Sequence, residues 1–414
     1  MKIVILSGNL GLFDATAKYT YYLTRTLIDA GHDVLCYTSA IDPQLQLPWA
    51  IHAESARLEP FKRRIGTWLM RVPMLLDFAL RLVGMLPGLK MGTVFGELGQ
   101  CDVVWIVYAS FTRLMSLPTR MKLGPKISVV LDYQGITPAY LVGRRTAVAQ
   151  KFAIAKLRTL ADKCDVLVAH SRFAADELRR NLGSDREVAV IPLFVDPILQ
   201  KAPVGNQLSS VRSQGDTPRR ILCVGRVAPS KRIDILLKAA ALLKRKGRKT
   251  TITVVGRIDQ PYDKERLRLE ALALSLRLES DLAFKGIVPP DHLTQLYLQS
   301  DVFVSTSAHE GFCFPIIEAM ALGLPVVTSN AGALPEVVGD AGLLFDFPSH
   351  EDLEAKLIEL FSNPLLLRNL VMAGLQRARL FTLENFSRNT STFVADLEPA
   401  GNGSERLSAR EGQI

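Results

Sequence analysis

The chain has 414 residues, 48% of them hydrophobic, a length that predicts two domains of about 200 residues each. Its five cysteines are scattered and form no C-x-x-C pair, which argues against a disulfide framework or a zinc site and for a reducing cytoplasm. The first residues do not resemble a signal peptide, and no uncharged apolar stretch reaches about 18 residues, so no spanning helix is expected.

The chain opens with a pattern typical of a strand, a helix and a second strand. Residues 3–7 predict a buried strand, a loop with Gly8 and Gly11 follows, and a helix runs to Ala30 before a strand at 32–38. The glycines alone are weak evidence for a ligand site, because any strand-to-helix turn favours glycine.

The net charge of +9 belongs mainly to the first half of the chain. Residues 1–200 hold 24 Lys and Arg against 17 Asp and Glu, an excess of +7. Within them, residues 57–90 interleave seven basic side chains with Trp68 and many aliphatic residues, a basic amphipathic pattern expected at an anionic membrane surface. A helical insertion that packs on the core, with solvated arginines, explains the pattern equally well. The stretch is too apolar for nucleic acid, and no nucleic-acid motif accompanies it.

Three more strands and a linker complete the first half. Strands are predicted at 101–108, at 127–131, which is followed by Asp132, and at 166–171, which contains His170. His170 could face a cleft, although a buried histidine with satisfied hydrogen bonds is the commoner outcome. An amphipathic helix at 172–182, a strand at 188–195 and a linker at 197–219, rich in Pro, Gly, Ser and Gln, follow in that order.

The second half begins with a strand at 220–224 and a loop that carries two cations. Arg226 and Lys231 lie on either side of this loop, and Lys231 stands at the start of a helix. A cation at a helix N-terminus opposes the helix dipole by about 0.3–1 kcal/mol, and a bound polyanion would remove that penalty. Two solvated surface cations are the alternative. Strands at 251–255, 282–288, 301–306 and 325–329 alternate with helices and predict a second doubly wound sheet.

The most informative stretch runs from Ser305 to Gly323. A buried strand leads into the loop 309–314, Pro315 opens a helix, and Gly323 ends it. Glu310 lies on the loop and Glu318 about one turn into the helix, with seven residues between them. In an open α/β sheet, ligands bind where a strand's carboxyl end faces a helix N-terminus. One carboxylate there can face a cationic transition state, and the other can accept hydrogen bonds from sugar hydroxyls.

This stretch resembles the signature of the family-4 retaining glycosyltransferases of the GT-B fold, Glu-Gly-Phe-Gly-x-Pro-x-x-Glu-Ala-Met-Ala. Cys313 departs from it, because the commonest family members carry glycine there. The resemblance implies two doubly wound, Rossmann-like α/β/α domains that face each other across a cleft. It places an acceptor domain at 1–196, a nucleotide-sugar domain at 220–382 and a helix that crosses back at 383–397. The polar composition of residues 398–414 predicts a disordered tail.

The resemblance also implies roles for individual residues. Arg226 and Lys231 match the pair that clamps the donor diphosphate, Glu310 would act at the donor sugar, and Glu318 would hold the ribose. The remaining donor-site residues implied in this way are Gly225, Ile287, Gly311, Phe312, Cys313 and Phe314. No metal and no cofactor are expected, because the two cations supply the charge that the leaving diphosphate needs.

The resemblance is looser in the first domain. The family's Gly-Gly pair falls on Asp14-Ala15, and Leu131 stands where many members have a histidine before Asp132. The acceptor-side candidates are Gly11, Asp14, Asp132 and His170. The general base is not identified; the donor phosphate can serve, with Asp132 as a weak protein candidate.

The sequence thus predicts a metal-independent retaining glycosyltransferase that moves a sugar from a nucleotide-diphosphate sugar to a glycan or lipid-linked acceptor. We expect it in the cytoplasm, at the inner face of the membrane if residues 57–90 bind lipid. The alternatives are a non-catalytic nucleotide-sugar-binding scaffold, which the lost Gly-Gly and histidine favour slightly, and a phosphate-using disaccharide phosphorylase of the same fold.

Overall fold

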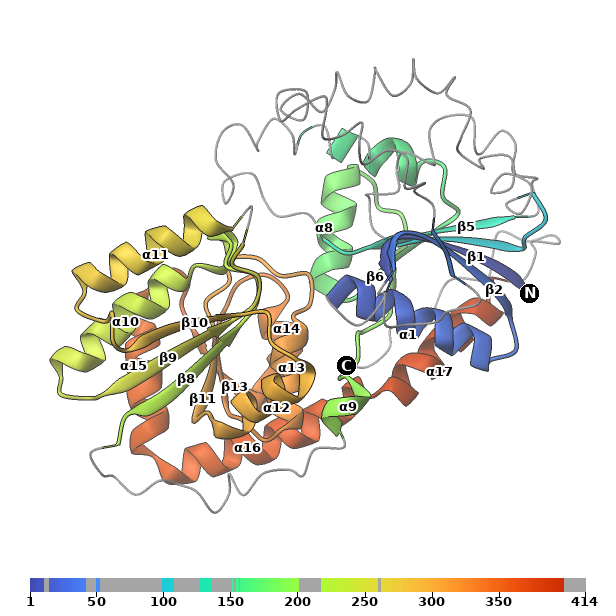
Figure 1. The fold of residues 1–414 in the computed structure, drawn as a ribbon. Coiled ribbons are helices and arrows are strands. Elements are labelled where there is room, and N and C mark those ends of the chain that lie inside the picture. Colours follow the sequence, from blue (N-terminus) through green and yellow to red (C-terminus); the bar gives the residue numbers. More distant parts are fainter. Residues whose placement is uncertain are drawn as a thin grey trace.

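The chain folds into two α/β units, shown in the computed structural model of Figure 1. The structure describes residues 1–10, 15–41, 50–52, 99–107, 127–135, 151, 154–155, 157–200, 217–259 and 262–397. Gly11 and Asp14, the basic stretch 57–90, the linker residues 201–216 and the tail 398–414 lie outside these ranges.

The first unit is built on a seven-stranded parallel sheet. Its strand order is β3-β2-β1-β4-β5-β6-β7, so the order reverses between β1 and β4. The strands are β1 Lys2–Leu10, β2 Asp33–Ile41, β3 Ala50–His52, β4 Val103–Val107, β5 Ser128–Tyr133, β6 Val166–Ala169 and β7 Ala189–Val190. Their buried, β-branched side chains are what a parallel sheet covered on both faces requires.

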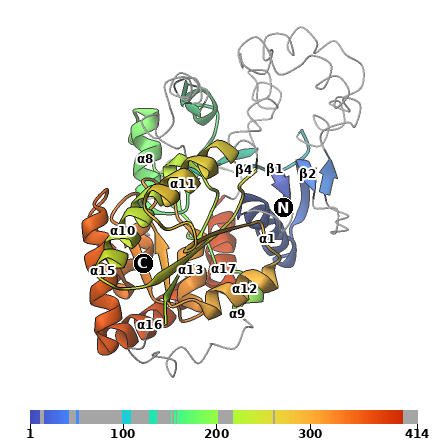
Figure 2. The ribbon, with the colours of Figure 1, turned by 60° about the vertical axis from the view of Figure 1, so that its left-hand side comes forward.

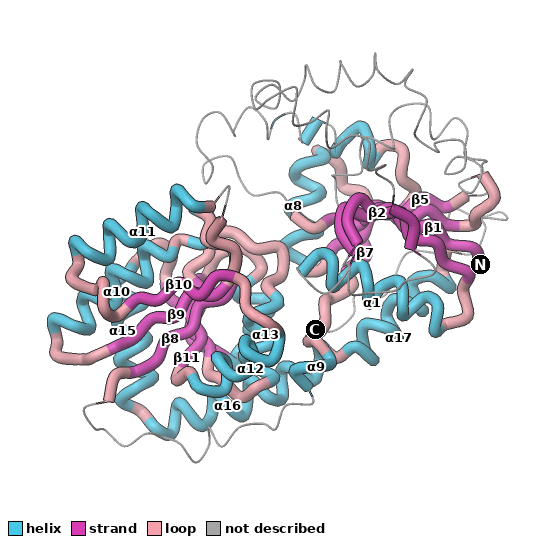
Figure 3. Tube along the Cα trace, viewed as in Figure 1, coloured by secondary structure: helices cyan, strands magenta, loops and turns pink. Residues whose placement is uncertain are grey.

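The second unit repeats this plan with a six-stranded parallel sheet. Its order is β10-β9-β8-β11-β12-β13, with the reversal between β8 and β11. The strands are β8 Arg219–Val224, β9 Thr250–Val255, β10 Leu282–Gly286, β11 Val302–Ser305, β12 Val326–Ser329 and β13 Gly342–Phe345. The two sheets stand apart as separate groups of strands in Figure 3, and both follow the doubly wound order that the sequence predicts.

Helices cover both sheets. In the first unit these include α1 Ala15–Asp29 and α8 Arg172–Leu182, and α9 Pro197–Gln200 follows them in the chain. The second unit contains α10 Ile233–Arg245, α11 Asp263–Ser275, α12 Pro290–Gln299, α13 Phe314–Ala321, α14 Leu334–Val338, α15 His350–Ser362 and α16 Pro364–Ala378, with single 3-10 turns at Pro229–Lys231, Gly339–Ala341 and Arg379–Phe381. One core lies beneath α10, α11 and α15, and α12, α13 and α14 pack on the opposite face.

The last helix returns to the first unit. α17 Leu383–Ala395 starts at Thr382, whose side chain caps it by accepting from Asn385 N at 3.2 Å. It packs on α1, where the hydroxyls of Thr26 and Ser387 lie 3.0 Å apart. Figures 1 and 2 show α16 along the bottom of the second unit and α17 beside α1.

One predicted strand is much shorter than expected. Within 188–195 only Ala189 and Val190 pair with β6, because backbone groups of the following residues bond to His170 and Phe381 instead. Ile191 O faces the His170 ring, and Val195 N donates to Phe381 O at 2.7 Å. The helix at 172–182 and the glycine stop at Gly323 are confirmed. Within the described residues, no helix is long and apolar enough to cross a membrane.

Candidate active site

Two loops of the second unit meet where its strand order reverses. One follows β8 and ends in the 3-10 turn Pro229–Lys231; the other follows β11 and contains Glu310. Ala308 N donates to Ser230 O at 2.8 Å, and Thr306 Oγ1 donates to Lys231 O at the same distance. The carboxyl ends of β8 and β11 therefore carry a braced pair of loops at the position where open α/β sheets bind ligands.

Lys231 and Glu310 form an ion pair at this point. Their side chains are only 18% and 15% exposed, and Ser307 Oγ also donates to Glu310 Oε1 at 2.7 Å. Burial opposes the ionisation of Glu310, but the Lys231 ammonium and the Ser307 hydroxyl outweigh it and hold the pKa of Glu310 below its usual range. Burial likewise opposes the charge of Lys231, yet Glu310 raises its pKa. Both groups are therefore charged at neutral pH.

Glycines allow the backbone to approach this pair closely. A Cβ on Gly225 would lie 3.3 Å from Lys231 Cε, and one on Gly256 would overlap Gly225 O at 2.1 Å. A Cβ on Gly332 would lie 2.7 Å from Glu310 N, and the next residue, Ala333, donates its N–H to Glu310 O at 3.0 Å. A side chain at Gly225 would crowd Lys231, one at Gly256 would push apart the loops after β8 and β9, and one at Gly332 would push the Glu310 loop away from the loop after β12.

Arg226 and Ile287 lie at the rim of the same region. The Arg226 guanidinium donates to Tyr262 OH at 3.2 Å, and its charge is close enough to oppose that of Lys231. The Ile287 side chain follows β10 and is 63% exposed. Neither side chain is locked in the core, so both can contact a ligand bound over the two loops.

The loop after Glu310 reaches the first unit and then enters α13. Phe312 is buried against Phe381, with ring centroids 5.5 Å apart, and Phe314 begins the helix. Cys313, the residue before it, has φ 98° and ψ 81°, a region that favours glycine. The departure from the family signature thus falls where the backbone asks for glycine.

Glu318 lies in the second turn of α13 and is only 5% exposed. Tyr297 OH donates to its Oε2 at 2.9 Å, and Lys18 of α1 lies close enough to stabilise its charge. Burial nevertheless dominates and raises the pKa of Glu318. The Lys18 ammonium also pairs with Asp196 at 2.6 Å, so Glu318 sits where the two units meet.

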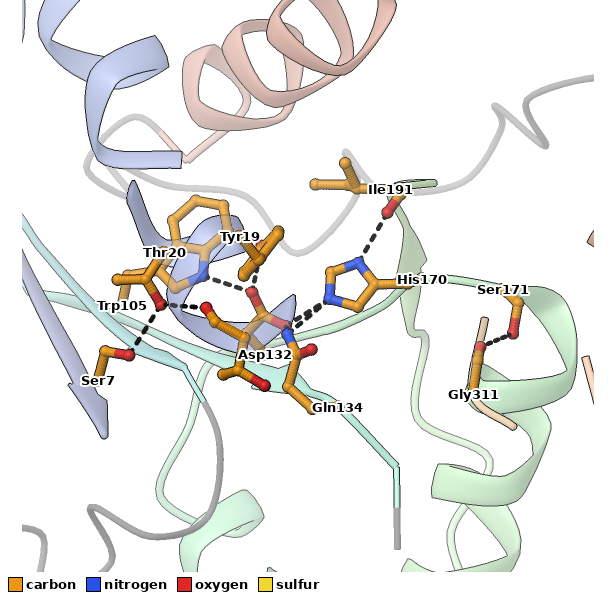
Figure 4. Close-up of polar contacts among 11 residues, drawn as sticks. Ser7, Tyr19, Thr20, Trp105, Asp132, Gln134, His170, Ser171, Ile191 and Gly311 are labelled. Atoms are coloured by element: carbon orange, nitrogen blue, oxygen red, sulfur yellow. Dashed lines mark hydrogen bonds and ion pairs between the residues drawn. The ribbon is translucent and has the colours of Figure 1, made fainter. Parts of the chain in front are cut away.

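Figure 4 shows a buried polar cluster in the first unit, centred on the fully buried Asp132. Tyr19 OH donates to its carboxylate, and Trp105 Nε1 does so at 3.0 Å. Gln134 Nε2 and His170 Nε2 both lie 2.9 Å from Oδ1. On the other side of its ring, His170 Nδ1 lies 2.9 Å from Ile191 O. Asp132 and His170 are thus brought together, and His170 has the satisfied bonds of a buried histidine.

The two regions touch at Gly311. Ser171 Oγ donates to Gly311 O at 2.7 Å (Figure 4), and a Cβ on Gly311 would lie 3.4 Å from Gln134 O. Gly135, which follows Gln134, has φ 93° and lies against the same residue. The loop after β5 and the loop after β11 are therefore in van der Waals contact where the two units meet.

The structure brings the predicted donor-site residues of the second unit to one edge of its sheet, and Gly11 and Asp14 lie outside the described residues. Sequence reasoning missed the partners of Asp132 and Glu318. Tyr19 and Trp105 bond Asp132, Tyr297 bonds Glu318, and the nearby Lys18 pairs with Asp196. A weak signal was present, because a tyrosine or tryptophan inside an apolar run needs a polar partner when it is buried. Among the described residues, no three His, Cys, Asp or Glu side chains are grouped in a way that could hold a metal ion.

Two family models match the chain. Residues 16–198 match the model described as Glycosyltransferase Family 4, and residues 207–377 match Glycosyl transferases group 1. The chain is 32% identical over 229 residues to the D-inositol 3-phosphate glycosyltransferase of Rhodococcus jostii (strain RHA1), covering 53% of this chain and 50% of that protein. It thus spans about half the length of such curated relatives. It is 26% identical over 405 residues to the MMP alpha-(1->4)-mannosyltransferase of Mycolicibacterium hassiacum, covering 90% and 92%.

Solved structures show the same fold over nearly the whole chain. Sucrose-phosphate synthase (tll1590) from Thermosynechococcus elongatus superposes with a TM-score of 0.73 at 20% identity, covering 96% of this chain and 98% of that one. Anabaena Alr3699/HepE, solved in complex with UDP-glucose, superposes with a TM-score of 0.71 at 17% identity, covering 95% and 99%. The chain therefore belongs to the group 1 glycosyltransferases of Glycosyltransferase Family 4 and has their GT-B fold.

Proposed function

We propose that this protein is a retaining glycosyltransferase that moves a sugar from a nucleotide-diphosphate sugar to a glycan or lipid-linked acceptor. Family membership supports transfer of a sugar, and the UDP-glucose bound by Alr3699/HepE supports a nucleotide-sugar donor. The relatives include a D-inositol 3-phosphate glycosyltransferase, and inositol phosphate carries free hydroxyl groups. This name supports a hydroxyl oxygen as the atom that receives the sugar.

The observation that carries the proposal is the Lys231–Glu310 ion pair at the reversal point of the second sheet. Without a ligand, the two charges neutralise each other. A donor diphosphate placed over the loops takes Lys231 and Arg226 as its partners, and the Glu310 carboxylate can then turn towards the sugar. As the glycosidic bond to phosphate breaks, negative charge grows on the diphosphate and positive charge grows on the sugar ring. The two cations stabilise the first charge and Glu310 the second.

The other site residues fit supporting roles in this scheme. The backbone N–H groups of Gly311–Phe314 would contact sugar hydroxyls, and Glu318 would accept from the ribose. The acceptor's proton would pass to the donor phosphate, because Asp132 is enclosed by the side chains around it and has no exposed surface. Since Arg226 and Lys231 supply the positive charge, we propose that transfer needs no divalent metal; activity should survive EDTA.

Donor binding tests the proposal directly. UDP-glucose, GDP-mannose and ADP-glucose would be titrated into the protein by calorimetry, followed by the Lys231→Ala variant with the donor that binds. A charge-assisted contact is worth about 1.5–3 kcal/mol, so the variant should bind that donor about 10- to 150-fold more weakly. The matched control is Lys238→Ala, a lysine further along α10. Equal donor affinity in wild type and Lys231→Ala would rule out the clamp.

A membrane surface is the second part of the proposal. The basic, apolar residues 57–90 should bring the protein to anionic liposomes at low salt, and release should follow as salt rises, because exposed charges are screened beyond about 10 Å at 0.1 M. Replacing Arg63, Arg64 and Arg71 together should abolish sedimentation with the liposomes. Equal sedimentation of wild type and triple variant would assign the stretch to internal packing instead.

A further inference from the structure

Helix α8 stands at the boundary between the two units, as Figure 1 shows. Its own residues form both of its ends. Ser171 caps the N-terminus, where its Oγ accepts from Ala174 N at 3.0 Å, and Gly183 closes the C-terminus with φ 66°. Two N–H groups of the first turn, those of Arg172 and Phe173, have no acceptor within the helix, as at every helix start.

Glu336 of the second unit supplies the missing acceptors. Arg172 N donates to Glu336 Oε1 at 2.7 Å, and Phe173 N donates to Oε2 at 3.0 Å. Both oxygens of the carboxylate therefore accept hydrogen bonds from the N-terminus of the helix, where the helix dipole favours a negative charge. A cap made by another unit exists only while the two units are together.

Two further contacts join α8 to the loop after β11. Ser171 Oγ donates to Gly311 O at 2.7 Å, and His309 Nε2 lies 2.5 Å from Glu177 Oε1. Glu177 is held in turn by Tyr133 OH at 2.8 Å. One face of α8 thus bonds the loop after β11, residues 306–313, which we call the donor loop, and the N-terminus of α8 bonds Glu336 of α14.

The second unit connects Glu336 to the donor loop. Ala333, three residues before Glu336, donates its N–H to Glu310 O at 3.0 Å, and Gly332 lies so close that a Cβ would overlap Glu310 N. On the other side, Arg377 Nη2 donates to Glu336 O at 2.6 Å and fixes α14. A displacement of α14 relative to α8 therefore carries the backbone of Glu310 with it.

We propose that Glu336 is a positioning residue, which caps α8 of the other unit and thereby holds the Glu310 loop against the first unit in the arrangement required for transfer. The tie between the units does not depend on the chemistry; only its effect on turnover rests on the proposed function. Glu336 acts through α14 and the loop, so it should affect turnover far more than it affects donor affinity.

The test uses a variant pair that removes the same bond from either side. Glu336→Ala removes the acceptor, with Glu336→Gln as a milder variant should the first fail to fold. Arg172→Pro removes one donor N–H. Proline is tolerated in the first position of a helix, and Ser171 already has the extended conformation, φ −152° and ψ 161°, that a residue before proline adopts. Arg172→Ala controls for loss of the side chain, and Glu359→Ala, which removes an exposed side chain on α15 of the same unit, controls for loss of a carboxylate.

The expected results separate positioning from simple stabilisation. Glu336→Ala should lower kcat about 10- to 100-fold, the equivalent of one charge-assisted bond, while the donor Kd changes less than about threefold. Arg172→Pro should lower kcat relative to Arg172→Ala, and the double variant Glu336→Ala with Arg172→Pro should be no worse than Glu336→Ala alone. Turnover near the wild-type value in Glu336→Ala, or strictly additive losses, would overturn the proposal.

Two measurements keep this test independent of the assigned activity. The Arg172 and Phe173 amides should exchange faster in Glu336→Gln than in wild type, while the amides in the middle of α8 stay protected. The radius of gyration in solution should be larger for Glu336→Ala than for Glu359→Ala. If neither quantity changes, the tie itself is wrong. If both change while no sugar transfer is found with any donor, the tie stands and the proposed function fails.

Discussion

The two polar clusters near the boundary between the units differ in how their charges are held. The donor-side pair Lys231–Glu310 is partly exposed, and each member has one opposite charge as its main partner. Asp132, in the first unit, is fully buried and surrounded by the polar groups of four other side chains. Lys231 or Glu310 can exchange its one charged partner for a ligand. Asp132 cannot bind a ligand without losing several hydrogen bonds. The first is suited to chemistry and the second to holding its loop in place.

Removing the centre of the buried cluster should have the largest effect. Asp132→Ala leaves the Tyr19 hydroxyl, the Trp105 indole N–H and the His170 ring without their acceptor, and such a loss costs about 3–5 kcal/mol of unfolding free energy. Urea denaturation measures this. Asp176→Ala, which breaks an exposed pair with Arg179, should cost less than about 1 kcal/mol. Equal losses of unfolding free energy in the two variants would show that the Asp132 cluster does not stabilise the fold.

The donor-side pair should respond in rate rather than in stability. Glu310→Gln removes a charge that matters mainly in the transition state, so kcat should fall about 100- to 1,000-fold, or about 2.7–4 kcal/mol. Donor affinity should be kept or raised, because the diphosphate then becomes the main partner of Lys231. Steady-state kinetics and calorimetry check both parts. A variant that turns over at the parent rate would remove Glu310 from the reaction.

Glu318 combines features of both clusters, because its side chain is buried but we propose that it binds the donor ribose. Glu318→Gln should raise the donor KM about tenfold with little change in kcat, because ribose contacts are the same in ground and transition states. Its folded pKa lies above the usual 4.5, so its contribution to stability is present below that pH and lost as pH rises through the raised value.

The glutamine variant should therefore be as stable as wild type at pH 4 and more stable than wild type at pH 8, because only the wild-type carboxyl must ionise in its buried site. Tyr297→Phe removes a hydrogen bond to the charged carboxylate of Glu318. The stability that is lost between pH 4 and pH 8 should therefore be larger in Tyr297→Phe than in wild type. A glutamine variant that is destabilised equally at both pH values would show that burial does not dominate at Glu318.

The smallest effect concerns the loop itself. A non-glycine residue in a strained region costs about 1–3 kcal/mol, part of which glycine returns as unfolded-state entropy, so Cys313→Gly should stabilise the fold by about 1 kcal/mol. Cys313→Ala keeps the Cβ and should give no such gain. Thermal unfolding of the two variants side by side measures the difference; equal melting temperatures would locate the strain elsewhere.

Local patterns predicted the second unit well. The strand at 302–305, the loop glycine and the proline that opens α13 each impose a local geometry, and together they place Glu310 and Glu318 near one sheet edge. The phosphate-facing assignment of Arg226 and Lys231 needed the resemblance as well, because two cations near a helix start also occur on ordinary surfaces.

The first unit was harder to predict because its site is made by distant parts of the chain. Asp132 meets Tyr19, 113 residues earlier, and His170, 38 positions later, and nothing in the local pattern of any of them requires the contact. The contacts between units are of the same kind. Arg172, Ser171 and Glu177 read as an ordinary amphipathic helix, and only the tertiary arrangement shows that Glu336, Gly311 and His309 complete it.

The junction near Val195 has a mechanical consequence. The chain leaves the first unit beside Val195 and returns to it beside Phe381, and the bond from Val195 N to Phe381 O joins these two passages at 2.7 Å. Because one hydrogen bond joins the two segments at a single point, we expect rotation of the units about that point to be easier than sliding of one segment along the other. Phe381 also meets Phe312 of the donor loop edge to face, with centroids 5.5 Å apart. We therefore expect that a rotation of one unit about this point would displace Phe312, two residues from Glu310, and with it the donor loop.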